Sequence, residues 1–224
     1  MDERIARRAW LARMAALGAF GAAGLSGVMS RALAKGDLAN AQSLYKVDGS
    51  AKINGKAASA GAPIALGDRI ETGPGSQAVV VMRGDAFLMR AQTIIEVRSR
   101  SGGVMDDLRV NAGKLLSVFS AKPVSISAKN ATIGIRGTGA YLEVDPGEVY
   151  FCLCYGEAVA GAPGMPDRTV KTTHHEQPLL LRDAGGYQPA GFRNHTDDEL
   201  ILLESLVGRE PPFMKGGQYP ANKY

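Results

Sequence analysis

Short apolar runs separated by Gly, Pro, Asn or Asp make up the middle of the chain, from Gln42 to Pro189. Apolar and polar residues tend to alternate within these runs, which is typical of β-strands with one buried face. No stretch from Lys46 to Pro189 repeats apolar residues at helical spacing over about ten positions. The pattern predicts an all-β domain over residues 42–190, with stacked short strands arranged as a β-solenoid-like fold or a compact sandwich.

Turn residues predict where the strands end. Asn54-Gly55 is a strong hairpin signal, because both residues tolerate a positive φ angle. The strands expected from these breaks are Val47–Ile53, Ile64–Ile70, Ala78–Met82, Ala86–Met89, Thr93–Val97, Leu108–Val110, Lys114–Phe119, Val124–Ser127, Thr132–Ile135, Ala140–Val144, Val149–Cys154, Glu157–Ala160, Thr169–Thr172 and Leu179–Leu181.

One C-terminal α-helix is expected over residues 196–208. Thr196 and Glu199 have the spacing of a capping box, in which each side chain binds the other residue's backbone N–H. Gly208 is typical of the residue that follows a helix. The apolar residues at helical spacing are Leu200, Leu203, Leu206 and Val207. Residues 209–224 contain three Pro and two Gly, and we expect a flexible tail there.

The first 34 residues have the three-part plan of an export signal. A basic region precedes the uncharged run Ala15–Val28, and a small-x-small cleavage site follows at Ala32 and Ala34. The run is shorter than the roughly 20 residues that span a bilayer as a helix. Arg7-Arg8-Ala9-Trp10-Leu11 resembles the twin-arginine motif, the alternatives being an ordinary secretory signal or an amphipathic helix. We therefore predict a twin-arginine signal peptide over 1–34, cleaved near Ala34, and a periplasmic mature protein without a membrane span.

Composition narrows the class of protein further. The chain has 26 Lys+Arg and 22 Asp+Glu, for a formal charge of +4, and five of the Arg and two of the acids lie within residues 1–34. The remaining 21 basic and 20 acidic residues nearly balance, so no nucleic-acid partner is expected. An apolar fraction of 45% and only two Cys exclude a disordered chain and a disulfide-rich scaffold.

Five segments between about Val47 and Gly156 resemble, in order and spacing, the FecR domain family of periplasmic sensor domains in bacterial iron-uptake regulators. They are Val47–Ala51, Leu66–Ser76 with its Thr-Gly-x-Gly-Ser corner, Gly84–Ala86, Gly113-Lys114 and Ala131–Thr138 with its Arg-Gly-Thr sequence. The resemblance implies an all-β domain of stacked short strands that binds or signals rather than catalyses.

The family's regulators carry a cytoplasmic segment that handles a sigma factor, placed before a membrane span. This chain has only the predicted export signal in that position. We therefore expect no direct sigma-factor binding, and instead a freestanding exported FecR-like domain with another envelope protein as its partner.

Both cysteines lie in one short segment, Phe151-Cys152-Leu153-Cys154. Residues i and i+2 of a strand face the same side, so the two sulfur atoms are expected to project together. About twenty residues later, His174 and His175 supply two imidazoles. Two thiolates with imidazoles form the ligand set of a tetrahedral zinc site, and such a set also serves iron or an iron–sulfur centre. Adjacent strand residues point to opposite faces, so both histidines can bind only if their segment is a turn.

Three interpretations of this segment stay open. The first is a metal site made by Cys152, Cys154, His174 and His175. The second is a disulfide between the two cysteines, at the limit of the tolerated Cα separation. The third is a pair of half-buried thiols that behave as small apolar groups beside surface histidines. The third histidine, His195, precedes the expected helix cap and is expected to be exposed.

An enzyme is not expected. The run His174-His175-Glu176 could supply a general base, but no nucleophilic serine motif, paired carboxylates or metalloprotease helix accompanies it. Two classes of function remain: a non-enzymatic exported sensor or interaction domain, and a periplasmic protein that binds zinc, iron or an iron–sulfur centre.

Overall fold

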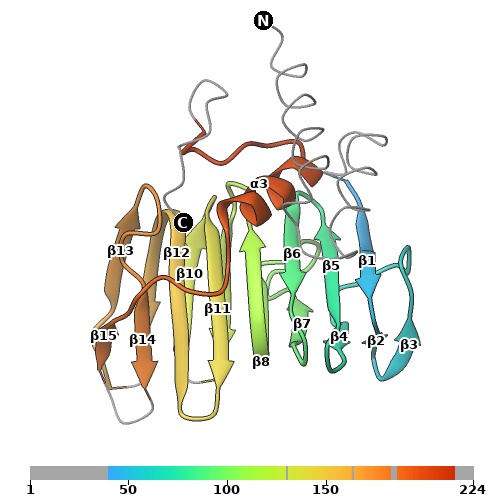
Figure 1. The fold of residues 1–224 in the computed structure, drawn as a ribbon, viewed down its shortest axis with the longest axis horizontal. Coiled ribbons are helices and arrows are strands. Elements are labelled where there is room, and N and C mark those ends of the chain that lie inside the picture. The colour runs from blue at the N-terminus through green and yellow to red at the C-terminus, as the bar shows by residue number, and fades with distance from the viewer. Residues whose placement is uncertain (1–39, 130, 163, 183–185, 215–224) are drawn as a thin grey trace, which may run out of the picture.

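Fifteen strands and one helix form the secondary structure of the computed structural model, which describes residues 40–129, 131–162, 164–182 and 186–214 (Figure 1). The predicted all-β class with one C-terminal helix is confirmed. In chain order the elements are β1 (Gln42–Asp48), β2 (Ala51–Ile53), β3 (Lys56–Ala58), β4 (Arg69–Thr72), β5 (Gln77–Met82), β6 (Asp85–Met89), β7 (Ile94–Arg98), β8 (Asp107–Val118), β9 (Pro123–Ala128), β10 (Ala131–Arg136), β11 (Gly139–Asp145), β12 (Glu148–Gly161), β13 (Arg168–Thr172), β14 (Leu179–Arg182), β15 (Tyr187–Pro189) and α3 (Asp197–Leu206).

The expected signal peptide over residues 1–34 and the last part of the expected tail, residues 215–224, lie outside the described residues. Among the described residues, no helix has the length and apolar character needed to cross a membrane.

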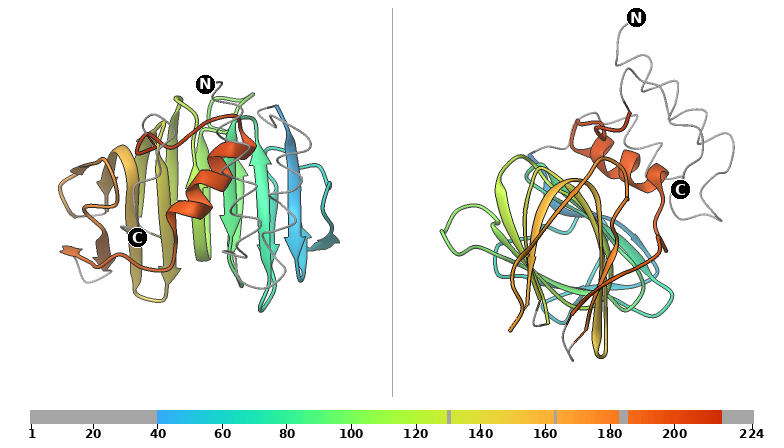
Figure 2. Two further views of the ribbon diagram at one scale, coloured as in Figure 1. Left: turned by 45° about the horizontal axis from the view of Figure 1, so that its top comes forward. Right: turned by 90° about the vertical axis from the view of Figure 1, so that its left-hand side faces the viewer.

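The strands form two sheets that face each other. Sheet A has the order β1-β5-β6-β8-β11-β12-β14-β15, with every neighbouring pair antiparallel. Sheet B has the order β3-β2-β4-β7-β8-β9-β10-β12-β13, in which only β8 and β9 are parallel. Because β8 and β12 belong to both sheets, they join the two layers into one structure (Figure 2).

Each shared strand changes sheets at a glycine. β8 pairs within sheet B up to Ala112 and within sheet A from Gly113, while β12 pairs within sheet A up to Tyr155 and within sheet B from Gly156. Gly113 and Gly156 have φ angles of 89° and 99°, which favour glycine. The sequence predicted two separate strands at each place, and this expectation was wrong because the glycine bends the strand without ending it.

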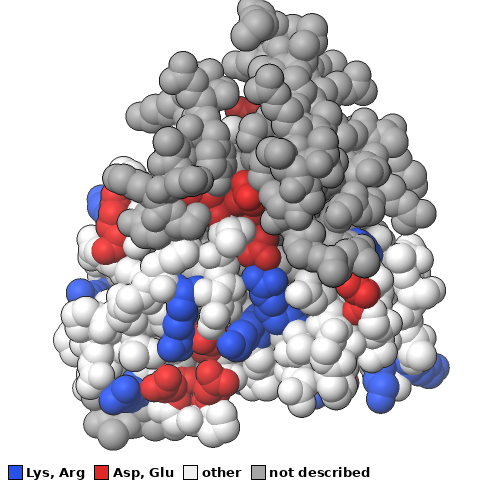
Figure 3. All heavy atoms as spheres, in the orientation of Figure 1, with Lys and Arg blue, Asp and Glu red and all other residues white. Residues whose placement is uncertain are grey.

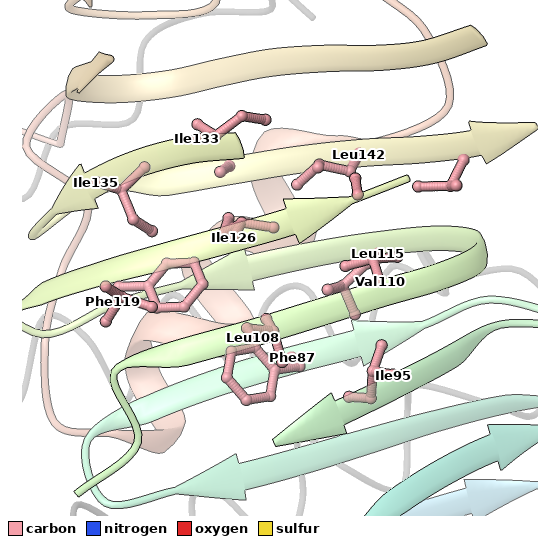
Figure 4. Close-up of a cluster of buried hydrophobic side chains, with 14 of the residues drawn as sticks. Phe87, Ile95, Leu108, Val110, Leu115, Phe119, Ile126, Ile133, Ile135 and Leu142 are labelled. Atoms are coloured by element: carbon pink, nitrogen blue, oxygen red, sulfur yellow. The ribbon is translucent and has the colours of Figure 1, made fainter. Parts of the chain in front are cut away.

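The main core fills the space between the two sheets. Its side chains alternate along the strands with side chains that face outward, as a pleated sheet requires. Figure 4 shows a group of the core side chains. Within it, the rings of Phe87 and Phe119 lie 5.6 Å apart. Residues after β15 contribute nothing to this core among the residues that the structure describes.

A second apolar cluster, here called the outer cluster, covers the other face of sheet A. It combines outward-facing residues of β5, β6, β8, β11 and β12 with Leu200, Leu203, Leu206 and Val207 from α3 and the residue after it. In Figures 1 and 2, α3 lies across this outer face, outside the two-sheet body. The predicted capping box of Thr196 and Glu199 is present at its start.

Two further expectations can be compared with the fold. The hairpin at Asn54-Gly55 is confirmed: it joins β2 to β3, with φ angles of 51° and 77°. The expected strand Val47–Ile53 is instead divided between β1 and β2, because Gly49 has a φ angle of 85° and the two parts pair in different sheets.

Candidate functional site

The two cysteines lie on the outward face of β12. Val149, Phe151 and Leu153 point into the core between the sheets, so Cys152 and Cys154 point into the outer cluster. Both side chains are fully buried, and both thiols are free rather than joined in a disulfide. The strand therefore presents two sulfur atoms side by side beneath the C-terminal segment, as the i, i+2 spacing predicted.

His175 approaches the sulfurs from the connection between β13 and β14. The chain bends at residues 173–175, and His175 itself has a φ angle of 57°. Glu176 stabilises the bend by accepting hydrogen bonds from Thr172 Oγ1 (2.5 Å) and Thr173 N (2.7 Å). This bend turns the His175 ring inward, where its Nδ1 lies 3.5 Å from Cys152 Sγ and only 2% of the residue is exposed.

His195 completes the group, and the expectation that it is exposed was wrong. It is 3% exposed, and its Nε2 lies 3.6 Å from Cys154 Sγ and 3.2 Å from His175 Nδ1. The Tyr141 ring stacks on the imidazole at 4.4 Å, and the Arg193 carbonyl oxygen lies 2.8 Å from His195 Nδ1. His195 is buried because the chain from β15 to α3 crosses the outer face of β11 and β12 before the helix begins.

The four ligand atoms form one compact cluster that could hold a metal ion. Cys152 Sγ, Cys154 Sγ, His175 Nδ1 and His195 Nε2 all lie within 4.8 Å of one another. A tetrahedral ion with bonds of about 2.0 to 2.3 Å separates its ligand atoms by roughly 3.3 to 3.8 Å. The nitrogen–sulfur separations of 3.5 and 3.6 Å and the nitrogen–nitrogen separation of 3.2 Å fit this geometry.

His174, which the sequence placed in the metal site, lies just outside this cluster. Its Nε2 is 2.8 Å from Asp197 Oδ1, and His175 Nε2 is 3.0 Å from the same oxygen. Asp197 is 1% exposed, and it is the first residue of α3. A carboxylate that binds the far nitrogen of a ligand histidine fixes the ring's tautomer and orientation, which is a common outer shell of metal sites.

The electrostatic environment favours the ionised forms of Cys152 and His175 and the neutral form of Cys154. The hydrogen bonds from Cys154, His175 and His195 lower the pKa of the Cys152 thiol to about 4 against the opposing effect of burial. Burial raises the pKa of the Cys154 thiol. Although burial opposes it, hydrogen bonding to Asp197 and Cys152 raises the pKa of His175. A metal ion would therefore replace protons that the cysteines and His175 share, so binding would release protons.

A charged network surrounds the outer side of the site. Glu143, 3% exposed, accepts hydrogen bonds from Tyr141 Oη (2.8 Å) and Asn194 Nδ2 (2.6 Å), and it pairs with Arg193 Nη2 at 2.9 Å. The guanidinium of Arg193 lies over the Tyr150 ring at 4.3 Å. These contacts fix the two residues before His195. Figure 3 shows basic and acidic side chains side by side on this face.

No protein-family model matches the sequence, and no curated protein matches it. Among solved structures, two crystal structures of a "putative anti-sigma factor" from Parabacteroides distasonis are similar to the chain. They have 9% and 10% sequence identity and TM-scores of 0.47 and 0.46. Each match covers 55% of this chain and 58% of the other, so it spans little more than half of that protein.

Fold and site together define a class: a two-sheet all-β domain with a buried Cys₂His₂ cluster beneath its C-terminal helix. The sequence indicated three of the four clustered residues, Cys152, Cys154 and His175. It missed His195, for which the only available signal was that this is the third and last histidine of the chain, after His174 and His175.

Proposed function

We propose that this protein binds a single metal ion, zinc in the first place, through Cys152, Cys154, His175 and His195. The observation that supports this most directly is the convergence of four buried ligand atoms within 4.8 Å. Thiolate and imidazole ligands in a tetrahedral arrangement are typical of structural zinc sites. An iron–sulfur centre fits less well, because it spreads its protein ligands over more than one iron atom and needs wider separations.

The role of this ion follows from the number of ligands. Catalytic zinc sites keep one position open for water or substrate, whereas structural sites use four protein ligands. Here four protein groups fill the tetrahedron, and each is at most 3% exposed. We infer that the ion has a structural or sensing role and that the protein is not an enzyme.

Metal analysis of the full chain, produced without a histidine tag and purified under reducing conditions, tests the proposal. We expect about one zinc per chain by inductively coupled plasma mass spectrometry, since the cluster has room for one tetrahedral ion. One iron per chain without sulfide would support the proposed site but would identify iron, and not zinc, as its metal. No stoichiometric binding of zinc or iron, even after incubation of the reduced protein with either ion, would contradict the proposal.

We further infer that the domain works outside the cytoplasm as a FecR-like interaction module with a partner in the bacterial envelope. The three-part pattern of residues 1–34 and the five FecR-like segments support this inference. A β domain commonly recruits an extended partner by pairing along an exposed edge strand.

Mass spectrometry of the protein recovered from its native cell envelope checks the export step. We expect the mature chain to begin at Lys35 or a close neighbour, because the small residues at Ala32 and Ala34 suit the signal peptidase. Recovery of the exported protein with Met1 intact would rule out cleavage, and recovery only from the cytoplasm would rule out export.

A further inference from the structure

The C-terminal segment, here residues 190–214, packs onto a body that is already closed without it. The core between the sheets contains no residue of this segment among those described. The segment instead packs on the outer cluster, through Phe192, Phe213 and the apolar face of α3. It is therefore an added layer, and its opening would leave the core between the two sheets buried.

The four metal ligands are divided between these two parts. Cys152, Cys154 and His175 come from the two-sheet body, and only His195 comes from the C-terminal segment. Asp197 adds a second link, because this first residue of α3 binds His175 and His174, which both belong to the body. An ion at this site would join the start of α3 to β12 and to the β13–β14 connection.

Other contacts hold the segment whether or not a metal is bound. Arg90 Nη2 lies 2.8 Å from Glu199 Oε1, the Tyr155 hydroxyl donates a hydrogen bond to Glu204, and Arg209 binds both Glu204 and the Gly84 carbonyl oxygen. These contacts lie along α3 and at its end. In the metal-free protein, these contacts hold α3 on the body, and Asp197 still binds His174 and His175 at the start of the helix.

We propose that the bound metal ion fastens the C-terminal segment to the outer face of sheet A, so that metal occupancy controls how often α3 opens. This inference rests on the proposed metal site and states what that site regulates. Opening α3 pulls His195 away from the cysteines, so it removes one of four ligands from the ion. By linkage, the ion then favours the closed state by the ratio of its affinities for the closed and open states.

Release of α3 uncovers an apolar surface on sheet A. The helix packs on β6 and β8, where Leu88, Leu116 and Val118 alternate with core residues, and Val79 and Val81 of β5 belong to the same outer cluster. A contiguous apolar face of this kind is unusual on a free protein surface. Metal loss would therefore make α3 open more often and raise the fraction of molecules in which this apolar surface is exposed to solvent.

Hydrogen exchange of the full chain, measured with and without zinc, tests the inference. Without metal, we expect the amides of Leu200–Leu206 to exchange before those of Leu115–Val118 in β8, since α3 opens while the body stays folded. At a free zinc concentration 100 times the Kd, exchange in α3 should slow by about 10-fold to 100-fold, because opening weakens the hold on the ion.

Three variants, two of them controls, separate the contributions. Arg90→Ala removes the ion pair with Glu199, which involves no metal ligand. The amides of α3 should then exchange faster both with and without zinc, while the slowing caused by zinc stays the same. His174→Ala leaves all four ligands in place and should also keep the zinc effect. His195→Ala should remove the zinc effect on α3, because the remaining ligands all belong to the body.

Two results would overturn the inference. One is an apo protein in which α3 is as protected as β8, which would mean that the helix opens only on global unfolding. The other is a protein that binds one zinc without any change in the exchange of α3. Zinc content measured on the same samples separates the cases, since failure to bind zinc at all counts against the proposed metal site itself.

Discussion

The His195→Ala variant is expected to bind zinc more than about 100-fold more weakly than the unmodified protein, because loss of an outer-shell partner alone typically costs 10-fold to 100-fold and His195 is a direct ligand. His174→Ala is the matched control. It removes an imidazole from a position adjacent to a ligand, but its Nε2 contacts Asp197 and not a sulfur. We expect its zinc affinity to fall by no more than about tenfold.

Competition with a chromophoric chelator measures both affinities, and far-ultraviolet circular dichroism shows whether each variant keeps its sheet content. Cobalt(II) in place of zinc adds a second readout, since thiolate ligands in a tetrahedral site give characteristic absorption bands. A larger loss of affinity in His174→Ala than in His195→Ala would show that the sequence-based choice of His174 is the better one.

Removal of the metal is expected to lower the melting temperature by about 5 to 10 °C. Zinc at 100 times its Kd stabilises the folded chain by about 2.7 kcal/mol. For a domain of about 150 to 250 residues, each kcal/mol corresponds to roughly 2 to 4 °C. The ion stabilises the folded state because only the folded chain brings the two cysteines and two histidines together from three distant segments.

Differential scanning calorimetry in the presence of reductant, with zinc or with a strong chelator, measures the shift. The His195→Ala variant provides the control, and its melting temperature should change little between the two conditions. Equal melting temperatures for the unmodified protein with zinc and with chelator would show that no ion bound at the cluster stabilises the folded chain.

Much of the fold followed from local patterns in the sequence. Alternation predicted the all-β class, and it placed Cys152 and Cys154 on the same side of one strand. The Asn54-Gly55 hairpin and the capping box of α3 depend on neighbouring residues only, and both are present. The two long strands were divided in the prediction because a glycine with a positive φ angle looks the same whether it ends a strand or bends it.

The full ligand set required tertiary information. His195 lies 41 residues after Cys154 in the chain, and its burial results from the path of the segment between β15 and α3. His174 and His175 are adjacent, and only the bend at residues 173–175 determines which ring reaches the sulfurs. A sequence pattern of period two describes strands, and it carries no information on how a connection between strands turns.

Leu153, the residue between the two cysteines, fills the core between the sheets while its neighbours face the proposed ion. The spacing of the two sulfurs is therefore inherited from the pleat of β12 and does not depend on a flexible loop. Inserting one residue between them would turn one thiol toward the core between the sheets and break up the pair. Any outward-facing strand position covered by a histidine-bearing connection offers the same starting point for designing a metal site into a β-sandwich.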